Sequence, residues 1–144
     1  MIFGIDYAKL RKEAMKEIAR GEQYKEKGSK FLGFFAQVES VAEFKQFMEL
    51  VKKEHKSASH YCYAYIIDEK AAGDQLSIFD DRIHKEKYSN DGEPSGCGNA
   101  LLDLLKRGNR ENCAVIVVRY FGGVLLGSGN LIRAYATAGK NVIC

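Results

Sequence analysis

The feature that most constrains this chain is a continuous apolar run, Cys113–Val118, which ends at Arg119 and is followed by four glycines within eight residues. The run has the length of a strand and is too short for most helices. Its lack of alternation is typical of a strand that is buried on both faces. A helical pattern of apolar residues resumes at Leu131. The sequence therefore predicts a central strand, a glycine-rich loop and a helix in succession.

The rest of the chain alternates strand and helix patterns. Aromatic and β-branched residues predict buried strands at 31–38 and 60–67. Ser40 and Glu43 have capping-box spacing and open a helix, and a second helix ends at Gly108. A first helix is predicted from Asp6 to Gly21, as part of a helical extension over residues 1–23. The polar stretch 70–90 contains an apolar patch, 76–79, that fits a strand or a loop anchor equally well.

Alternation gives the 60–67 strand two different faces. His60, Cys62, Ala64 and Ile66 form one face, whose small residues suit close packing against helices. Tyr61, Tyr63 and Tyr65 lie on the other. If that face is open, the tyrosines form a platform on which single-stranded bases can stack; the alternative is a covered packing stripe.

The chain has 144 residues with 46% hydrophobic and 28% charged residues, which fits one globular domain. Its net charge is only +3, but residues 106–144 carry six basic side chains and one acidic. The four cysteines have no paired spacing, and the longest apolar run is far short of a membrane helix. We expect a cytoplasmic protein that has no contact with a membrane.

The 119–133 segment contains the parts of an anion site. A helix start exposes unpaired backbone amides, and glycines let a phosphate approach them. Ser128 or Asn130 can cap the helix, and Arg133 follows in its first turn. The predicted anion or nucleic-acid contacts are Arg119, Gly122, Gly123, Gly127, Ser128, Gly129 and Arg133. The alternative is that the glycines only allow a tight turn, since neither standard nucleotide-binding glycine pattern is present.

A secondary candidate site lies at the turn 91–96, where Asp91 and Glu93 could hold Mg²⁺ or transfer protons with His60 as proton carrier. That arrangement would suit an enzyme acting on a phosphorylated small molecule. Acidic residues in a turn before a proline are more often structural, and Ser95 can be a helix cap. His60 and Cys62 invite a zinc or catalytic interpretation, but core packing is favoured because no spaced partner pair accompanies them. We predict no catalytic residue, no metal and no cofactor.

Several segments together resemble the signature of the IMPACT family, which includes the bacterial YigZ-type proteins. They are Ser29–Phe31, His60–Cys62, Ser89–Gly96, Arg119–Gly123, Leu126–Gly129 and Leu131–Tyr135. The resemblance covers residues 24–144 in the family's order. It departs at Cys97–Ala100, where the family has threonine, alanine and glycine, and at Asn130, where it has glycine. The ferredoxin-like second domain of the bacterial members is not found in the sequence.

The resemblance implies an α+β fold like the second domain of ribosomal protein S5, with a mixed four-stranded sheet and helices on one face. Eukaryotic members resemble regulators of translation, and bacterial members are suspected of binding nucleic acid. No established reaction comes with the family. We therefore expect a non-enzymatic domain, alone or oligomeric, that engages RNA phosphates or a ribosome-associated protein, with a pure protein-interaction module as a further alternative.

Overall fold

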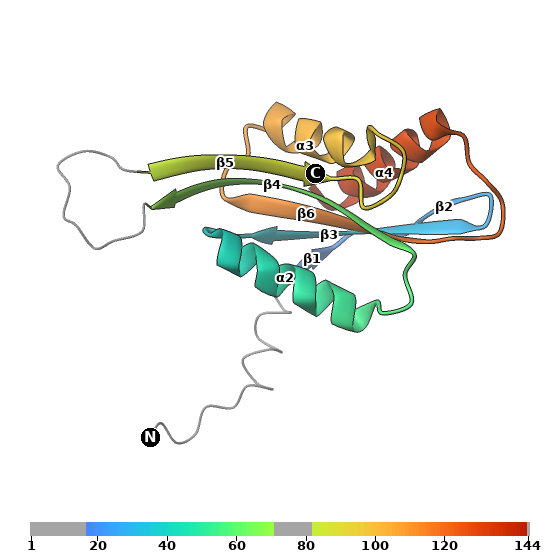
Figure 1. The fold of residues 1–144 in the computed structure, drawn as a ribbon, viewed down its shortest axis with the longest axis horizontal. Helices are drawn as coiled ribbons and strands as arrows, with labels where there is room; N and C mark the ends of the chain where they lie inside the picture. Colours follow the sequence, from blue (N-terminus) through green and yellow to red (C-terminus); the bar gives the residue numbers. More distant parts are fainter. Residues whose placement is uncertain (1–16, 71–81, 144) are drawn as a thin grey trace, which may run out of the picture.

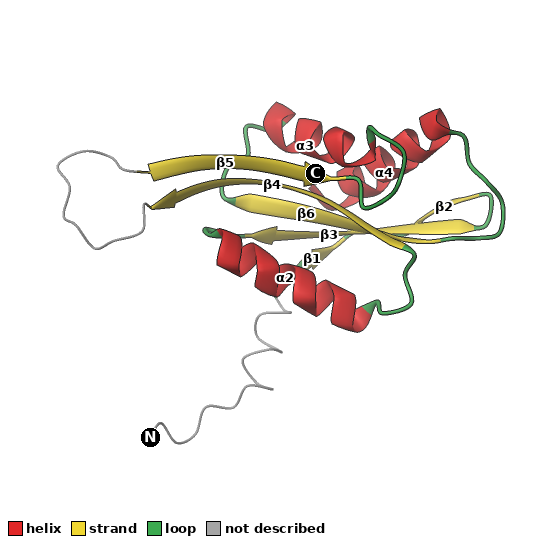
Figure 2. Ribbon diagram, viewed as in Figure 1, coloured by secondary structure: helices red, strands yellow, loops and turns green. Residues whose placement is uncertain are grey.

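The computed structural model describes residues 17–70 and 82–143, which form an α+β domain (Figures 1 and 2). Its elements, in chain order, are β1 (Ala19–Arg20), β2 (Tyr24–Glu26), β3 (Ser29–Gln37), α2 (Val41–Glu54), β4 (His60–Lys70), β5 (Arg82–Ser89), α3 (Cys97–Arg107), β6 (Cys113–Tyr120) and α4 (Ser128–Ile143). None of the described helices is long and apolar enough to cross a membrane.

The strands form one antiparallel sheet in the order β1-β3-β6-β4-β5, with β2 paired to β3. The apolar strand β6 lies at its centre, and its residues from Cys113 to Arg119 are all buried. The α+β class is confirmed. The expectation of a mixed four-stranded sheet is wrong, because the sheet has six strands among the described residues and every pairing is antiparallel.

Helices cover both faces of the sheet rather than one. Helices α3 and α4 pack on the face that carries Cys62, Ala64 and Ile66. Of the described helices, α2 packs on the opposite face, against Tyr65 and Ile67 (Figure 1). The expectation of helices on one face fails because β3, β4 and β6 are apolar on both faces and each face needs cover.

Local signals explain the helices that the sequence predicted. Ser40 caps α2, with its Oγ accepting a hydrogen bond from the amide of Glu43 at 3.1 Å. Gly108 ends α3, and α4 follows the glycine-rich loop as expected. Cys97–Arg107 buries Leu101 and Leu105 against the sheet.

Two polar segments depart from the expectation. Residues 82–89 form β5, although their pattern is polar, because an edge strand needs only backbone pairing with β4. Ala19 and Arg20 form the short strand β1 paired with β3, so the predicted first helix does not extend to Gly21. The rest of that helix and the 76–79 patch lie outside the described residues.

Candidate functional site

The turn between β5 and α3 places Glu93 against Arg119, the last buried residue of β6. The carboxylate and the guanidinium are each about 95% buried, and Arg119 Nη1 lies 2.9 Å from both carboxylate oxygens. A buried charge is stable only when it is paired and hydrogen-bonded. The two charges therefore neutralise each other inside the protein, although the two residues are far apart in the sequence.

Neighbouring hydroxyl groups complete this cluster. Tyr135 on α4 donates its phenol proton to Glu93 Oε2 at 2.5 Å. Arg119 Nη2 donates to Ser29 Oγ at 3.3 Å, and the backbone amide of Gly122 donates to the same oxygen at 3.2 Å. The cluster ties β3, β6, α4 and the turn before α3 into one buried polar network. We call Ser29, Glu93, Arg119 and Tyr135 the buried ion-pair cluster.

His60 lies at the surface edge of the buried ion-pair cluster. Its Nδ1 is 2.8 Å from the backbone oxygen of Asp91, and because a carbonyl oxygen only accepts, Nδ1 carries the proton. The other nitrogen, Nε2, is 3.4 Å from Glu93 Oε1. The imidazole is 28% exposed, so it is the member of this group that solvent reaches.

Burial keeps the neighbouring thiol and phenol groups protonated. It raises the pKa of Cys97 to about 11 and raises the pKa of Cys62 further. Burial, followed by the nearby Cys62 and Glu93, also raises the pKa of Tyr135 well above its ordinary value. Cys62 is fully buried and donates its thiol proton to the backbone oxygen of Asn90. Cys62 therefore behaves as a core residue, and Tyr135 remains a hydrogen-bond donor.

The residues of the predicted anion site fall into two groups. Arg119 and the Gly122 amide are already occupied by Glu93 and Ser29 inside the protein. A Cβ at Gly122 would lie 2.0 Å from the backbone of Gly28, so this glycine is required for close packing of the chain. Gly123, Gly127, Ser128, Gly129 and Arg133 are exposed.

Helix α4 begins at Ser128, where the amide of Leu131 bonds to the oxygen of Gly127 at 3.0 Å. Arg133 therefore lies in the second turn of the helix and not in the first as predicted. No heavy atom lies within 4 Å of a Cβ built at Gly123, Gly127 or Gly129, so the backbone of the loop faces open space. The two arginines that the sequence suggested would act together therefore differ in their surroundings: Arg119 is buried against Glu93, whereas Arg133 is exposed.

In the secondary candidate site the two carboxylates have different partners, and His60 lies beside both residues. Glu93 faces Arg119, whereas Asp91 Oδ2 accepts the backbone amide of Tyr61 at 2.7 Å. Residues 17–70 and 82–143 contain no cluster of three potential metal ligands. Ser95 does not cap α3, because Gly96 occupies the cap position with a left-handed backbone.

Sequence reasoning did not assign a site role to Ser29, Asn90 or Tyr135. Asn90 Oδ1 accepts the Gly98 amide at 2.7 Å and so takes the part expected of Ser95 at the start of α3. A Cβ at Gly98 would lie 2.4 Å from the oxygen of Ser89, which explains a glycine there. All three residues lie inside the segments that carried the family resemblance, which was the signal available for them.

Comparison with protein families gives a match over nearly the whole described domain. The family model of the Impact N-terminal domain matches residues 27–143. The chain is 38% identical over 115 residues to the IMPACT family member YvyE of Bacillus subtilis, covering 79% of this chain and 46% of that protein. It is 36% identical over 110 residues to the IMPACT family member YigZ of Escherichia coli, covering 76% and 49%. The chain thus spans about half the length of these relatives.

Solved structures show similar folds. A crystal structure described as a hypothetical protein superposes with a TM-score of 0.72 at 29% identity, over 88% of this chain and 60% of that one. The two-domain translational regulator Yih1 superposes with a TM-score of 0.54 at 25% identity, over 89% and 46%.

Proposed function

The chain belongs to the IMPACT family, and we propose that it is a non-enzymatic binding domain associated with translation that engages RNA phosphates. The similarity to Yih1, which is named a translational regulator, supports the association with translation. The buried ion-pair cluster supports a binding role over a reaction, since Glu93 and Arg119 hold each other and Tyr135 stays protonated.

The observation that carries this proposal is the exposed start of α4. The backbone of Gly127, Ser128 and Gly129 is open to solvent, and the helix dipole favours an anion there. Arg133 lies one turn further on, is exposed and forms no ion pair with any residue the structure describes. In this proposal Arg119 positions the loop through Glu93 and Ser29 and does not contact RNA.

Titration of a fluorescently labelled RNA by anisotropy at several salt concentrations tests the proposal. Each neutralised phosphate releases counterions, so affinity should fall steeply with added salt. The salt slope is the slope of log affinity against log salt concentration, and Arg133→Ala should lower its magnitude by about one. Lys140→Ala is the matched control, because Lys140 is exposed in the last turn of the same helix. Absent binding, or binding that ignores salt, would reject an RNA-binding role.

A second candidate function, a protein-interaction module, is favoured by the loop before α4. Phe121, Val124 and Leu125 are 51%, 48% and 86% exposed, and exposed apolar side chains gathered on one loop mark protein contacts. If this loop holds a ribosome-associated protein, Leu125→Asp should abolish its co-purification while RNA affinity is unchanged. Retained co-purification would remove this candidate.

We extend the proposal to location and fold. A cytoplasmic location is supported by three free, buried cysteines, Cys62, Cys97 and Cys113. A likeness to the second domain of ribosomal protein S5, a domain boundary near residue 24 and oligomer formation remain predictions. Gel filtration with light scattering would test the last.

A further inference from the structure

Among the described residues, a groove of about 370 Å³ lies between helix α2 and strands β4 and β5, where α2 does not cover the sheet. Its floor is aromatic and apolar. Tyr63 is half-buried, and the centre of its ring lies 4.8 Å from that of Phe44. The planes of the Tyr63 and Tyr65 rings are parallel to within 4°. We call this the tyrosine groove; its lining residues are Val41, Phe44, Lys45, Met48, Glu49, Lys52, Tyr61, Tyr63, Tyr65, Lys87 and Asp91.

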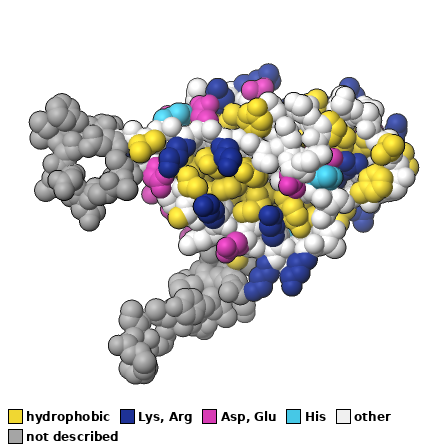
Figure 3. Space-filling model, in the orientation of Figure 1, with side chains coloured by type: hydrophobic (Ala, Val, Ile, Leu, Met, Phe, Trp, Pro, Cys, Tyr) yellow, Lys and Arg dark blue, Asp and Glu magenta, His cyan; other side chains and the backbone are white. Residues whose placement is uncertain are grey.

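Lysines surround the tyrosine groove. Lys45 and Lys52 come from α2, and Lys87 comes from β5, where it lies opposite Tyr65 in the sheet register. All three are exposed, and none forms an ion pair with the residues the structure describes. The Lys52 ammonium lies 5.4 Å from the centre of the Tyr61 ring. Figure 3 shows the result: an apolar area above α2 with basic side chains around it.

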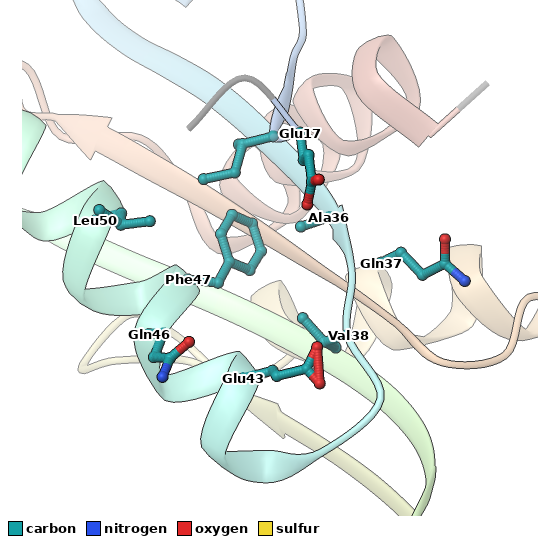
Figure 4. Close-up of a pocket in the computed structure, with 9 residues that line it drawn as sticks. Glu17, Ala36, Gln37, Val38, Glu43, Gln46, Phe47 and Leu50 are labelled. Carbon is teal, nitrogen blue, oxygen red and sulfur yellow. The ribbon is translucent and has the colours of Figure 1, made fainter. Parts of the chain in front are cut away.

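The opposite side of α2 provides a contrast. There a pocket of about 500 Å³ is lined by Glu17, Glu43, Gln46, Phe47 and Leu50, among others (Figure 4). Among the described residues that line it, two are carboxylates, Glu17 and Glu43, and none is a lysine or arginine. The tyrosine groove also has two carboxylates, Glu49 and Asp91, but it adds three lysines that the described lining of the other pocket lacks. The two sides of α2 therefore differ in their lysines.

We propose that the tyrosine groove binds a single-stranded RNA segment, with bases stacked on Tyr61 and Tyr63 and phosphates held by Lys45, Lys52 and Lys87. Aromatic platforms flanked by basic side chains hold unpaired bases without sequence preference, whereas a duplex hides the faces of its bases. This inference rests on the proposed RNA-binding function and specifies its substrate as single-stranded.

The groove is placed to continue the contact proposed at α4. His60, beside Tyr61, lies opposite Arg119 in the sheet register, and the amide of Phe121 donates to Ser59 Oγ at 3.1 Å. The Tyr61 end of the groove therefore opens at the same end of the sheet as the loop that leads to α4. An apolar groove can also take a helix of a protein partner. The basic rim and the aromatic floor favour RNA over such a helix.

Fluorescence anisotropy tests this inference with three labelled ligands of ten nucleotides. They are a single-stranded RNA, the same RNA annealed to its complement, and a ribose-phosphate chain of equal length without bases. The single strand should bind best. Tyr63→Leu keeps apolar packing but removes the aromatic plane, so affinity should fall roughly 5- to 150-fold, the loss expected for one stacked base. Tyr88→Leu is the matched control, because Tyr88 is exposed on β5 and lies opposite Ala64, on the other face of the sheet.

A charge pair provides a second test that leaves the fold intact. Lys52 and Lys53 are adjacent, exposed and both in the last turn of α2, but only Lys52 lines the tyrosine groove. Lys52→Gln should weaken binding and lower the salt slope by about one, whereas Lys53→Gln should change neither by as much.

The outcomes separate the groove from the wider function. Equal affinities for Tyr63→Leu and Tyr88→Leu, or an abasic strand that binds as tightly as RNA, would overturn the groove even if Arg133→Ala still weakens binding and the RNA function stands. If the unmodified protein binds no RNA, both proposals fail together. An acidic amphipathic peptide that binds in a Lys52-dependent way in place of RNA would show that the groove serves a protein partner.

Discussion

The two faces of the sheet differ in whether their charged and aromatic side chains are buried or exposed. On the face under α3 and α4, Glu93 and Arg119 are buried, mutually neutralised and joined by Tyr135. On the face under α2, three tyrosines line a groove whose lysines remain exposed. Within the described residues, one helix packs on this face and two pack on the other. The comparison teaches that Glu93 and Arg119, which belong to the most distinctive motifs of the sequence, stabilise the fold. The tyrosine groove, which belongs to a simple alternating pattern, is the surface that we propose for a ligand.

The largest effect is expected from a substitution in the buried ion-pair cluster, and it is a loss of folding stability. Glu93→Gln leaves the buried Arg119 charge unpaired and should lower the free energy of unfolding by about 3–5 kcal/mol. Urea unfolding followed by circular dichroism measures this. Glu54→Gln breaks the exposed Arg20–Glu54 pair and should cost about 1 kcal/mol or less. Similar losses for the two variants would contradict a structural role for the buried ion-pair cluster.

A smaller loss is expected from removing one hydroxyl group of the same cluster. Tyr135→Phe deletes a hydrogen bond to a buried carboxylate and should cost about 1.5–3 kcal/mol in the same unfolding measurement. Tyr88→Phe, at an exposed position, should change stability by less than about 0.5 kcal/mol. A neutral Tyr135→Phe would mean that Glu93 does not depend on this donor.

The closed face also predicts a pH dependence. Burial raises the pKa of Cys97 and of Cys113 from 9.0 to about 11. The unfolded thiols lose their protons first, so stability present below pH 9 declines as pH rises towards 11. Each thiol should remove about 1 kcal/mol between pH 8 and pH 10. Urea unfolding at both pH values checks this, with a Cys97→Ala, Cys113→Ala variant as reference. The variant keeps Cys62, whose pKa is also raised, so it should decline less than the wild type but still decline. An equal decline in the two proteins would exclude Cys97 and Cys113 as the cause.

The smallest effect on stability is expected from substitutions at the rim of the tyrosine groove. Lys45→Gln and Lys87→Gln change exposed side chains that form no ion pair within the described residues, so each should shift unfolding by less than about 0.5 kcal/mol while weakening RNA binding. Thermal unfolding and anisotropy on the same samples compare the two readouts. A large stability loss without a change in RNA affinity would reverse the comparison between the two faces.

Local signals allowed much of the fold to be predicted. The Ser40–Glu43 capping box located α2, and the unbroken apolar run located β6, because both signals depend on residues close in sequence. Strand β5 was not predicted, since its pairing partner is another segment and its own pattern is polar. The number of strands and the position of α2 on the second face depend on long-range packing that periodicity does not encode.

The candidate site was predictable in part for the same reason. Alternation placed the tyrosines on one face, but it could not show whether a helix covers them. Glu93 and Arg119 were each recognised as chemically suggestive, yet their pairing joins residues 26 positions apart. Because of that pairing, Arg119, which we predicted as a phosphate ligand, is a structural residue inside the domain.

The most direct test of the account is an amide chemical-shift map of the ¹⁵N-labelled protein titrated with a short single-stranded RNA. We expect the largest shifts along Tyr61–Tyr65 and Phe44–Lys52, with further shifts at the start of α4 and no shifts at Tyr135 or its neighbours in the buried ion-pair cluster. Shifts concentrated on Glu93, Arg119 and Tyr135, with none in the tyrosine groove, would contradict it.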